Sequence, residues 1–164
     1  MNWAVAKGIT SGTSATTFSP DASCTRAQMA TFLWRAAGSP EPKGISNPFT
    51  DVAADAYYAK AVQWAVEQGI TTGTSATTFS PDAACTRAQM ATFIYRCEQA
   101  NGGGFTGAWM FLLPFTDAPE WAYKPIAWCY KEGITSGTSA TTFSPDAPCT
   151  RAQLVTFLYR FFVK

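Results

Sequence analysis

Residues 69–96 read GITTGTSATTFSPDAACTRAQMATFIYR. Nearly the same stretch occurs twice more, as GITSGTSATTFSPDASCTRAQMATFLWR at residues 8–35 and as GITSGTSATTFSPDAPCTRAQLVTFLYR at residues 133–160. Self-similarity at a nearly constant spacing indicates one structural unit used several times, with neighbouring copies packed together. The sequence therefore predicts three related units rather than one undivided domain.

A second segment precedes two of these three stretches. It reads NPFTDVAADAYYAKAVQWAVEQ at residues 47–68 and LPFTDAPEWAYKPIAWCYKE at residues 113–132, whereas only WAVAK at residues 3–7 precedes the first stretch. The chain is therefore expected to hold two and a half units that together form one compact structural unit. We expect repeat 1, N-terminally truncated, at residues 1–43, repeat 2 at residues 44–104 and repeat 3 at residues 105–164.

Each unit is predicted to contain two helices around a turn-rich connector. In repeat 2, apolar residues recur at helical spacing from Tyr57 to Val66, and Gly69 follows where a helix ends in a left-handed residue. In repeat 3, Pro125 predicts a helix start near Lys124, because proline is favoured in the first helical turn. The polar connector, with its Ser-Pro-Asp turn, leaves room for a very short β segment at most. The predicted fold class is therefore mainly α.

The second helix of each unit is expected to start at a capping box with the sequence Thr-Arg-Ala-Gln. The Thr side chain accepts a hydrogen bond from the backbone N–H of the Gln, whose side chain accepts one from the backbone N–H of the Thr. This reciprocal arrangement is a strong signal for a helix N-terminus. The three pairs are Thr25 and Gln28, Thr86 and Gln89, and Thr150 and Gln153.

The composition excludes several classes of function. The chain is 47% hydrophobic and 14% charged, with a formal net charge of +1 and no histidine. This charge is too small for nucleic-acid binding, and the lack of histidine removes the commonest general base and transition-metal ligand. The apolar run at residues 108–115 is too short to span a bilayer, and no signal segment opens the chain, so a secreted form is expected already trimmed. We expect no enzyme activity, cofactor, metal site, nucleic-acid partner or membrane insertion.

Four motifs in this order resemble the S-layer homology (SLH) domain family over essentially the whole chain: Phe-Thr-Asp, a Trp-Ala helix ending in Gly-Ile, Phe-Ser-Pro-Asp, and Thr-Arg-Ala-Gln. The resemblance implies a three-pronged, pseudo-threefold helical assembly. It also implies a non-catalytic module outside the bacterial cell that binds secondary cell-wall polysaccharide, often through a pyruvylated and hence anionic sugar. The implied partner is cell-wall polysaccharide, and the implied sites are grooves between repeats.

The resemblance assigns ligand binding to the arginine of the capping motif, at Arg26, Arg87 and Arg151. An arginine at the first position of a helix stands beside free N–H groups, and its guanidinium can hold a carboxylate through two parallel hydrogen bonds. The alternative is that each arginine braces adjacent units through an ion pair. In this second interpretation the candidate carboxylates are Asp21, Asp82 and Asp146.

Two other recurring sets are candidates for ligand contact. Tryptophans in register could stack on a sugar face or could seal the core. Gly-Thr pairs could bring backbone N–H groups close to a ligand or could serve only the turn. The sets are Trp3, Trp64 and Trp128, and Gly12, Thr13, Gly73, Thr74, Gly137 and Thr138.

The five cysteines fall into two sets. Cys24, Cys85 and Cys149 directly precede the helix N-caps, where small buried side chains are expected to pack, and they lack the spacing of metal ligands. Cys97 and Cys129 each stand where the sister unit has alanine, on the helices flanking the second linker. A disulfide between these two would tie neighbouring units together, and the alternative is two separate core thiols.

The missing half of repeat 1 allows three interpretations. In the first, the chain is a fragment of a longer protein; in the second, another protein chain completes repeat 1. In the third, the aromatic stretch FTGAWMF at residues 105–111 covers the surface that the missing half leaves exposed. The gap would lie in a central bundle if the first helices of the units build that bundle. The aromatic stretch also supports an alternative function, a surface-displayed module that recognises a neighbouring surface protein or a host molecule.

Overall fold

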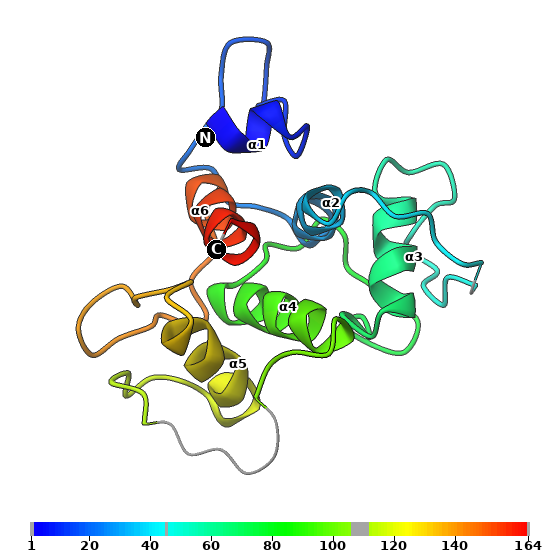
Figure 1. Ribbon diagram of the computed structural model, residues 1–164. Helices are drawn as coiled ribbons and strands as arrows, with labels where there is room; N and C mark the ends of the chain where they lie inside the picture. Colours follow the sequence, from blue (N-terminus) through cyan, green and yellow to red (C-terminus); the bar gives the residue numbers. More distant parts are fainter. Residues whose placement is uncertain (1, 45, 106–111, 164) are drawn as a thin grey trace.

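The computed structural model describes residues 2–44, 46–105 and 112–163. In this part of the chain helices are joined by loops, and β structure is limited to isolated bridges without a sheet (Figure 1). The predicted mainly α class is therefore confirmed. The helices are α1 (Asn2–Ala6), α2 (Arg26–Ala36), α3 (Ala59–Glu67), α4 (Arg87–Ala100), α5 (Glu120–Lys131) and α6 (Arg151–Phe162).

Three helix pairs form the prongs of the molecule. The helix α2 packs on α3, α4 packs on α5, and α6 packs on α1. Each pair thus joins the second helix of one repeat to the first helix of another. The contact between α6 and α1 connects repeat 3 back to repeat 1, so the three repeats are arranged in a closed circle. The helix α6 also contacts α2 and α4, and these three helices lie inside the outer helices α1, α3 and α5 (Figure 1).

The second helices therefore occupy the centre, and the premise that the first helices build a central bundle is wrong. The physical reason is the cap region, which brings the starts of α2, α4 and α6 together through backbone hydrogen bonds. As a result, the short first helix of repeat 1 leaves its gap in an outer prong rather than in the core.

A ring of three backbone hydrogen bonds joins the repeats. The N–H of Cys24 donates to the carbonyl of Cys149 (2.9 Å), that of Cys85 to Cys24 (2.8 Å), and that of Cys149 to Cys85 (2.8 Å). The three side chains are buried, as expected for small residues before an N-cap. These residues come from all three repeats, so the ring places the pseudo-threefold axis between them.

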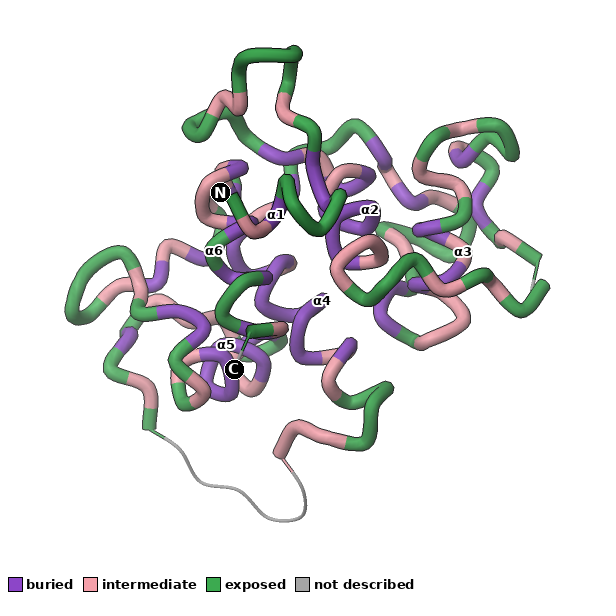
Figure 2. The backbone as a smooth tube through the Cα atoms, turned by 45° about the horizontal axis from the view of Figure 1, so that its top comes forward, coloured by how far each residue is buried: buried purple, intermediate pink, exposed green. Residues whose placement is uncertain are grey.

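The core is shared by the repeats rather than divided among them. One hydrophobic cluster includes buried residues from all six helices, among them Met29, Met90 and Leu154. A smaller cluster lies under α3 around Phe49 and Phe79. Buried residues accordingly concentrate at the centre of the molecule and exposed residues at the loop tips (Figure 2). Shared burial of this kind makes each repeat depend on its neighbours.

The helix ends confirm most of the local predictions. All three capping boxes are formed, and Gly69 ends α3 with a left-handed φ of 69°. The predicted start near Lys124 is wrong, because α5 begins at Glu120 and contains Pro125. Ala122, in the helical turn before the proline, is fully buried. No described helix has the length and hydrophobicity required to cross a membrane.

Candidate functional site

A groove of about 330 Å³ brings together residues from all three repeats. Arg26 at the start of α2 lies on one wall, α4 supplies a second wall, and Trp121 of α5 lies at the edge. Trp121 is 59% exposed, so its indole is available at the surface. The complete lining is Arg26, Thr71, Thr72, Gly73, Thr74, Gln89, Thr92, Phe93, Arg96 and Trp121.

Arg26 is only 4% exposed and is held by repeat 2. Its Nε donates to the carbonyl of Phe79 (2.8 Å), and its guanidinium carbon lies 4.8 Å from the Phe79 ring centre and 5.5 Å from that of Phe93. Burial lowers the pKa of Arg26 from its usual value. Its buried Nη2 has no hydrogen-bond partner among the described residues. A buried donor without a partner is costly, and because this atom is shielded from solvent, an anionic oxygen in the groove would reach it only after a shift of the side chain.

The other two motif arginines repeat this arrangement with one difference. Arg87 donates from Nε to Phe143 (2.8 Å) and Arg151 donates from Nε to Phe18 (2.8 Å), each across a repeat boundary. The Nη2 of Arg87 has no partner in the described part of the chain, whereas that of Arg151 donates to Thr10 Oγ1 (3.1 Å). All three arginines thus brace the repeats, but through carbonyl groups and aromatic rings. The carboxylates expected for a brace, Asp21, Asp82 and Asp146, are exposed.

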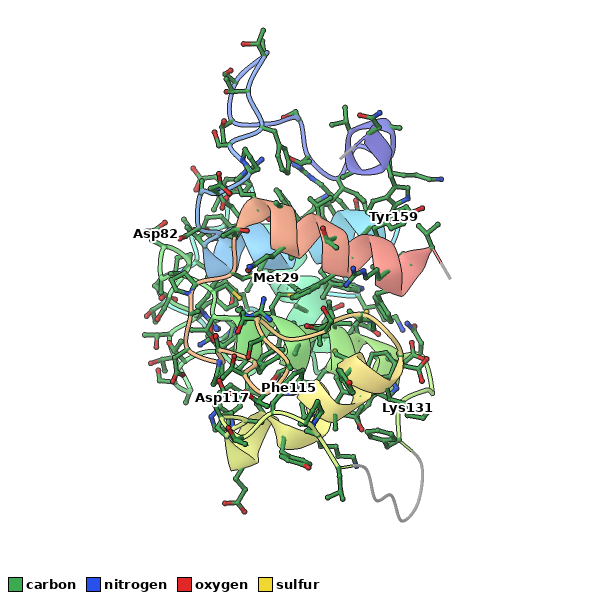
Figure 3. The ribbon with its side chains drawn as sticks, turned by 90° about the vertical axis from the view of Figure 1, so that its left-hand side faces the viewer. Met29, Asp82, Phe115, Asp117, Lys131 and Tyr159 are labelled. Carbon is green, nitrogen blue, oxygen red and sulfur yellow. The ribbon has the colours of Figure 1, made fainter. Side chains whose placement is uncertain are left out.

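The aspartate of the Phe-Thr-Asp segment fixes the connector loop beside each of two arginines. The carboxylate of Asp51 accepts hydrogen bonds from the backbone N–H groups of Phe79 (2.8 Å) and Ser80 (2.7 Å). Burial alone would raise the pKa of Asp51, but these hydrogen bonds and the charge of Arg26 lower it overall. Asp117 plays the same part in repeat 3, and Figure 3 shows it with Phe115 close to α5.

The tryptophans in register lie mainly in the core. Trp64 and Trp128 are 6% and 3% exposed, and Trp128 packs against the ring of Tyr95. Trp3 is partly buried and meets Tyr159 edge to face, with ring centres 5.5 Å apart. The indoles of Trp64 and Trp128 therefore face the core, whereas Trp3 also lines two surface pockets.

The Gly-Thr pairs shape the connector loop. Gly73 has a φ of 82°, and a Cβ there would collide with the carbonyl of Thr78. The N–H of Gly73 donates to Thr71 Oγ1 (3.1 Å), and that of Thr74 donates to Thr78 O (2.8 Å). These amides serve the turn, while the exposed edge of Thr74 still lines the groove. The pairs Gly12 and Thr13, and Gly137 and Thr138, form the same loop.

Cys97 and Cys129 are both buried free thiols, so the disulfide between them is not formed in this structure. Their helices α4 and α5 do pack together, and Cys129 Sγ lies 3.7 Å from the carbonyl of Ala91. Burial raises the pKa of Cys97 to about 11, which keeps that thiol protonated at neutral pH. Among the described residues, no cluster of His, Cys, Asp or Glu could hold a metal ion.

The sequence reasoning missed several groove residues, among them Arg96 and Trp121. Arg96 donates from Nη1 to the carbonyl of Ile70 (3.2 Å) and remains partly exposed. Trp121 occupies the position held in repeat 2 by Tyr57, which is 62% exposed. The aromatic residues at this shared register position, Tyr57 and Trp121, were a usable signal for a site. The spacing alone could not show which of these side chains a neighbouring repeat buries.

The family model for the S-layer homology domain matches residues 1–30, 48–91 and 114–155. The chain belongs to the S-layer homology family. An endoglucanase of Bacillus sp. (strain KSM-635) is 36% identical over 76% of this chain and 12% of its own length. The Surface-layer 125 kDa protein of Lysinibacillus sphaericus is 32% identical over 93% and 13%. A cellulosome-anchoring protein of Acetivibrio thermocellus is 30% identical over 87% and 33%. This SLH chain therefore corresponds to a minor part of each of these longer relatives.

Proposed function

We propose that this SLH chain is a non-catalytic module that anchors protein at the bacterial cell surface by binding anionic cell-wall polysaccharide. Its family and its similarity to a surface-layer protein and a cellulosome-anchoring protein support the anchoring role. The endoglucanase relative does not argue for catalysis here, because the chain spans only 12% of that protein. A cell-wall location follows from the same proposal.

The observation that carries the choice of ligand is the inter-repeat groove. It combines a buried guanidinium with an unpaired Nη2 at Arg26, a partly exposed Arg96 and an exposed indole at Trp121. An unpaired cationic donor suits a carboxylate or phosphate group, and an exposed aromatic face suits the apolar face of a sugar ring. Hydroxyl groups of Thr72 and Thr74 add neutral hydrogen-bonding partners for sugar hydroxyls.

In this proposal the residues of the groove have separate tasks. Arg26 supplies the donor at the base, Arg96 provides a second positive charge, and Trp121 stacks on the sugar. The Nη2 group of Arg151 already donates to Thr10 Oγ1. Of the sites beside Arg26 and Arg151, the one beside Arg26 is therefore the stronger candidate for an anion. Arg87 keeps an unpaired Nη2 and offers a second candidate base of this kind.

The test is cosedimentation of the purified chain with Lysinibacillus sphaericus sacculi, before and after hydrofluoric acid extraction of the secondary polymer. We expect binding to the untreated sacculi and at least a tenfold loss after extraction. Trp121→Ala and Arg96→Ala should each weaken binding to untreated sacculi by a similar factor. Binding that ignores extraction would contradict the polysaccharide assignment.

Lys60→Ala provides a matched control for loss of positive charge. Lys60 is 61% exposed in its side chain and pairs with Glu41 outside the groove. Its removal should leave binding unchanged. An equal loss in Lys60→Ala and Arg96→Ala would attribute the effect to net charge and contradict the groove.

A further inference from the structure

Three exposed aspartates gather at one end of the pseudo-threefold axis, where the central helices α2, α4 and α6 begin. Each repeat has a Pro-Asp-Ala turn that accepts hydrogen bonds from the first N–H groups of a central helix in another repeat. For α2, the N–H of Arg26 donates to Ala83 O (2.9 Å) and that of Ala27 to Pro81 O (3.0 Å). The motif arginines at these helix starts are buried, so the surface here presents carboxylates. They belong to Asp21, Asp82 and Asp146.

Positive charges gather at the opposite end, where the central helices finish. Each central helix has an arginine near its C-terminus, and the three are Arg35, Arg96 and Arg160. Their Nη1 groups donate to isoleucine carbonyl groups, and in the described part of the chain none of them is in an ion pair. Lys7 is exposed and lines a surface pocket with Arg35 and Val163, so it lies at this end as well.

The two sets of charges are well separated along the axis. Figure 3 shows Asp82 and Asp117 on one side of the molecule and Lys131 and Tyr159 on the other. An α-helix rises about 1.5 Å per residue, so the 14 residues of α4 separate the two ends by up to roughly 20 Å. That is about twice the Debye length of roughly 10 Å at 0.1 M salt, so the charges of one end are largely screened from those of the other.

We propose that copies of this chain stack head to tail, with the aspartate end of one copy against the arginine and lysine end of the next. Opposite charges favour this contact, whereas a contact between two equal ends brings like charges together. The pseudo-threefold axis adds a match of symmetry, because three turns that carry aspartate then face three helix ends that carry arginine. This proposal does not depend on polysaccharide binding in the groove.

A head-to-tail contact has two measurable consequences. It joins two different surfaces and leaves a free end on every assembly, so stacks grow beyond two copies instead of closing as dimers. Exposed ion pairs add little affinity and are screened by salt, so the contact should be weak and should need low ionic strength.

The test is sedimentation velocity of the intact chain over a series of protein concentrations, at about 10 mM and about 150 mM salt, where the Debye length is about 30 Å and about 8 Å. At low salt we expect the average mass to rise with concentration past that of a dimer. At the higher salt the association should be at least about fivefold weaker. A monomer under all conditions, a plateau at the dimer, or association that salt leaves unchanged or strengthens would overturn the proposal.

Charge reversal at each end locates the contact. Asp82→Lys with Asp146→Lys makes the first end cationic, and Lys7→Glu with Lys131→Glu makes the second end more acidic while leaving the groove intact. Each double variant alone should associate at least about tenfold more weakly at low salt. An equimolar mixture of the two should associate again, because each reversed end then meets an end of opposite charge. Absence of recovery in the mixture would overturn the head-to-tail arrangement.

Glu41→Lys is the matched control for reversal of a carboxylate. The Glu41 side chain is 73% exposed and pairs with Lys60, in the segment that joins repeats 1 and 2. Its reversal should leave association unchanged, whereas Asp82→Lys alone should weaken it at least about threefold. Equal effects of these two variants would overturn the assignment. So would a lower Tm of Asp82→Lys without any change in association, because the aspartates would then act only on the helix dipoles.

Discussion

Each motif arginine is held by another repeat, and this makes it a structural residue as well as a candidate ligand group. Arg87, for example, is 3% exposed, donates to Phe143 O and lies between the rings of Phe143 and Phe157. The sequence places arginine at the first turn of the helix but does not show which surface buries it. Its partners come from residues more than fifty positions away, which no local pattern reveals.

Removing this arginine should destabilise the whole chain. Arg87→Leu leaves the carbonyl of Phe143 unpaired and changes the packing of two rings, so we expect a loss of about 3 kcal/mol in the free energy of unfolding. Arg87→Lys should not restore stability, because lysine lacks the Nε–H that makes the bond. Urea unfolding measures both variants. A loss below about 0.5 kcal/mol, the range of ordinary surface substitutions, would contradict the brace.

The Phe-Thr-Asp aspartates predict a pH dependence. The folded state lowers the pKa of Asp117, because hydrogen bonds from Phe143 and Ser144 outweigh the opposing effect of burial. A lowered pKa contributes stability above the unfolded value of about 3.9, and this contribution is lost as pH falls through the folded value. Asp117→Asn should therefore cost about 1 kcal/mol at neutral pH, since the carboxylate is partly exposed.

The cost of Asp117→Asn should shrink as pH falls through the lowered folded pKa of Asp117, because the wild-type carboxyl is then also protonated. Urea midpoints of the two proteins, measured from neutral pH down through an acid series, provide the comparison. A difference that stays constant or grows on acidification would show that the charge of Asp117 has no stabilising role.

Helix starts were largely predictable from sequence, whereas helix packing was not. The capping boxes and the glycine after α3 follow from local chemistry and are formed as expected. The prediction from Pro125 misplaced the start of α5, which begins at Glu120 and carries the buried Ala122 in the turn before the proline. The exposed indole of Trp121 lies in that same turn, so the error in one helix boundary also hid a groove residue.

The capping box gives a prediction for a single element. Thr86 accepts the N–H of Gln89 (3.2 Å) at the start of α4. Thr86→Ala should cost about 1 kcal/mol, the usual price of losing such a cap. Thr77→Ala removes an exposed connector hydroxyl that makes no cap and should change stability by less than about 0.5 kcal/mol. Equal effects in thermal or urea unfolding would contradict a specific cap at α4.

The three repeats are joined into one molecule by the ring of backbone hydrogen bonds between Cys24, Cys85 and Cys149. The repeat count followed directly from sequence self-similarity, but the ring did not, because its hydrogen bonds join backbone groups of residues at least 61 positions apart. The same limit applied to the groove, where Arg26, Arg96 and Trp121 belong to three different repeats. The sequence repeats thus indicated where similar residues would recur. The hydrogen-bond ring that joins the three repeats determined which of those residues contact one another.

Ring closure predicts cooperative unfolding. The amides of Cys24, Cys85 and Cys149 should exchange with deuterium only through global unfolding, whereas connector amides exchange through local opening. Hydrogen exchange followed by NMR measures both sets. Faster exchange of the cysteine amides than of amides within α4 would show that the repeats separate before they unfold.

The central claim is that the groove beside Arg26 binds anionic cell-wall polysaccharide. The most direct measurement is a nitrogen–proton NMR titration with the polymer fraction that hydrofluoric acid releases from sacculi, following the side-chain indole signals. The account predicts that the Trp121 indole and the Arg96 Nε signal shift together and saturate, while the buried indoles of Trp64 and Trp128 do not move. Saturable shifts at Trp64 and Trp128 with Trp121 unchanged would contradict it.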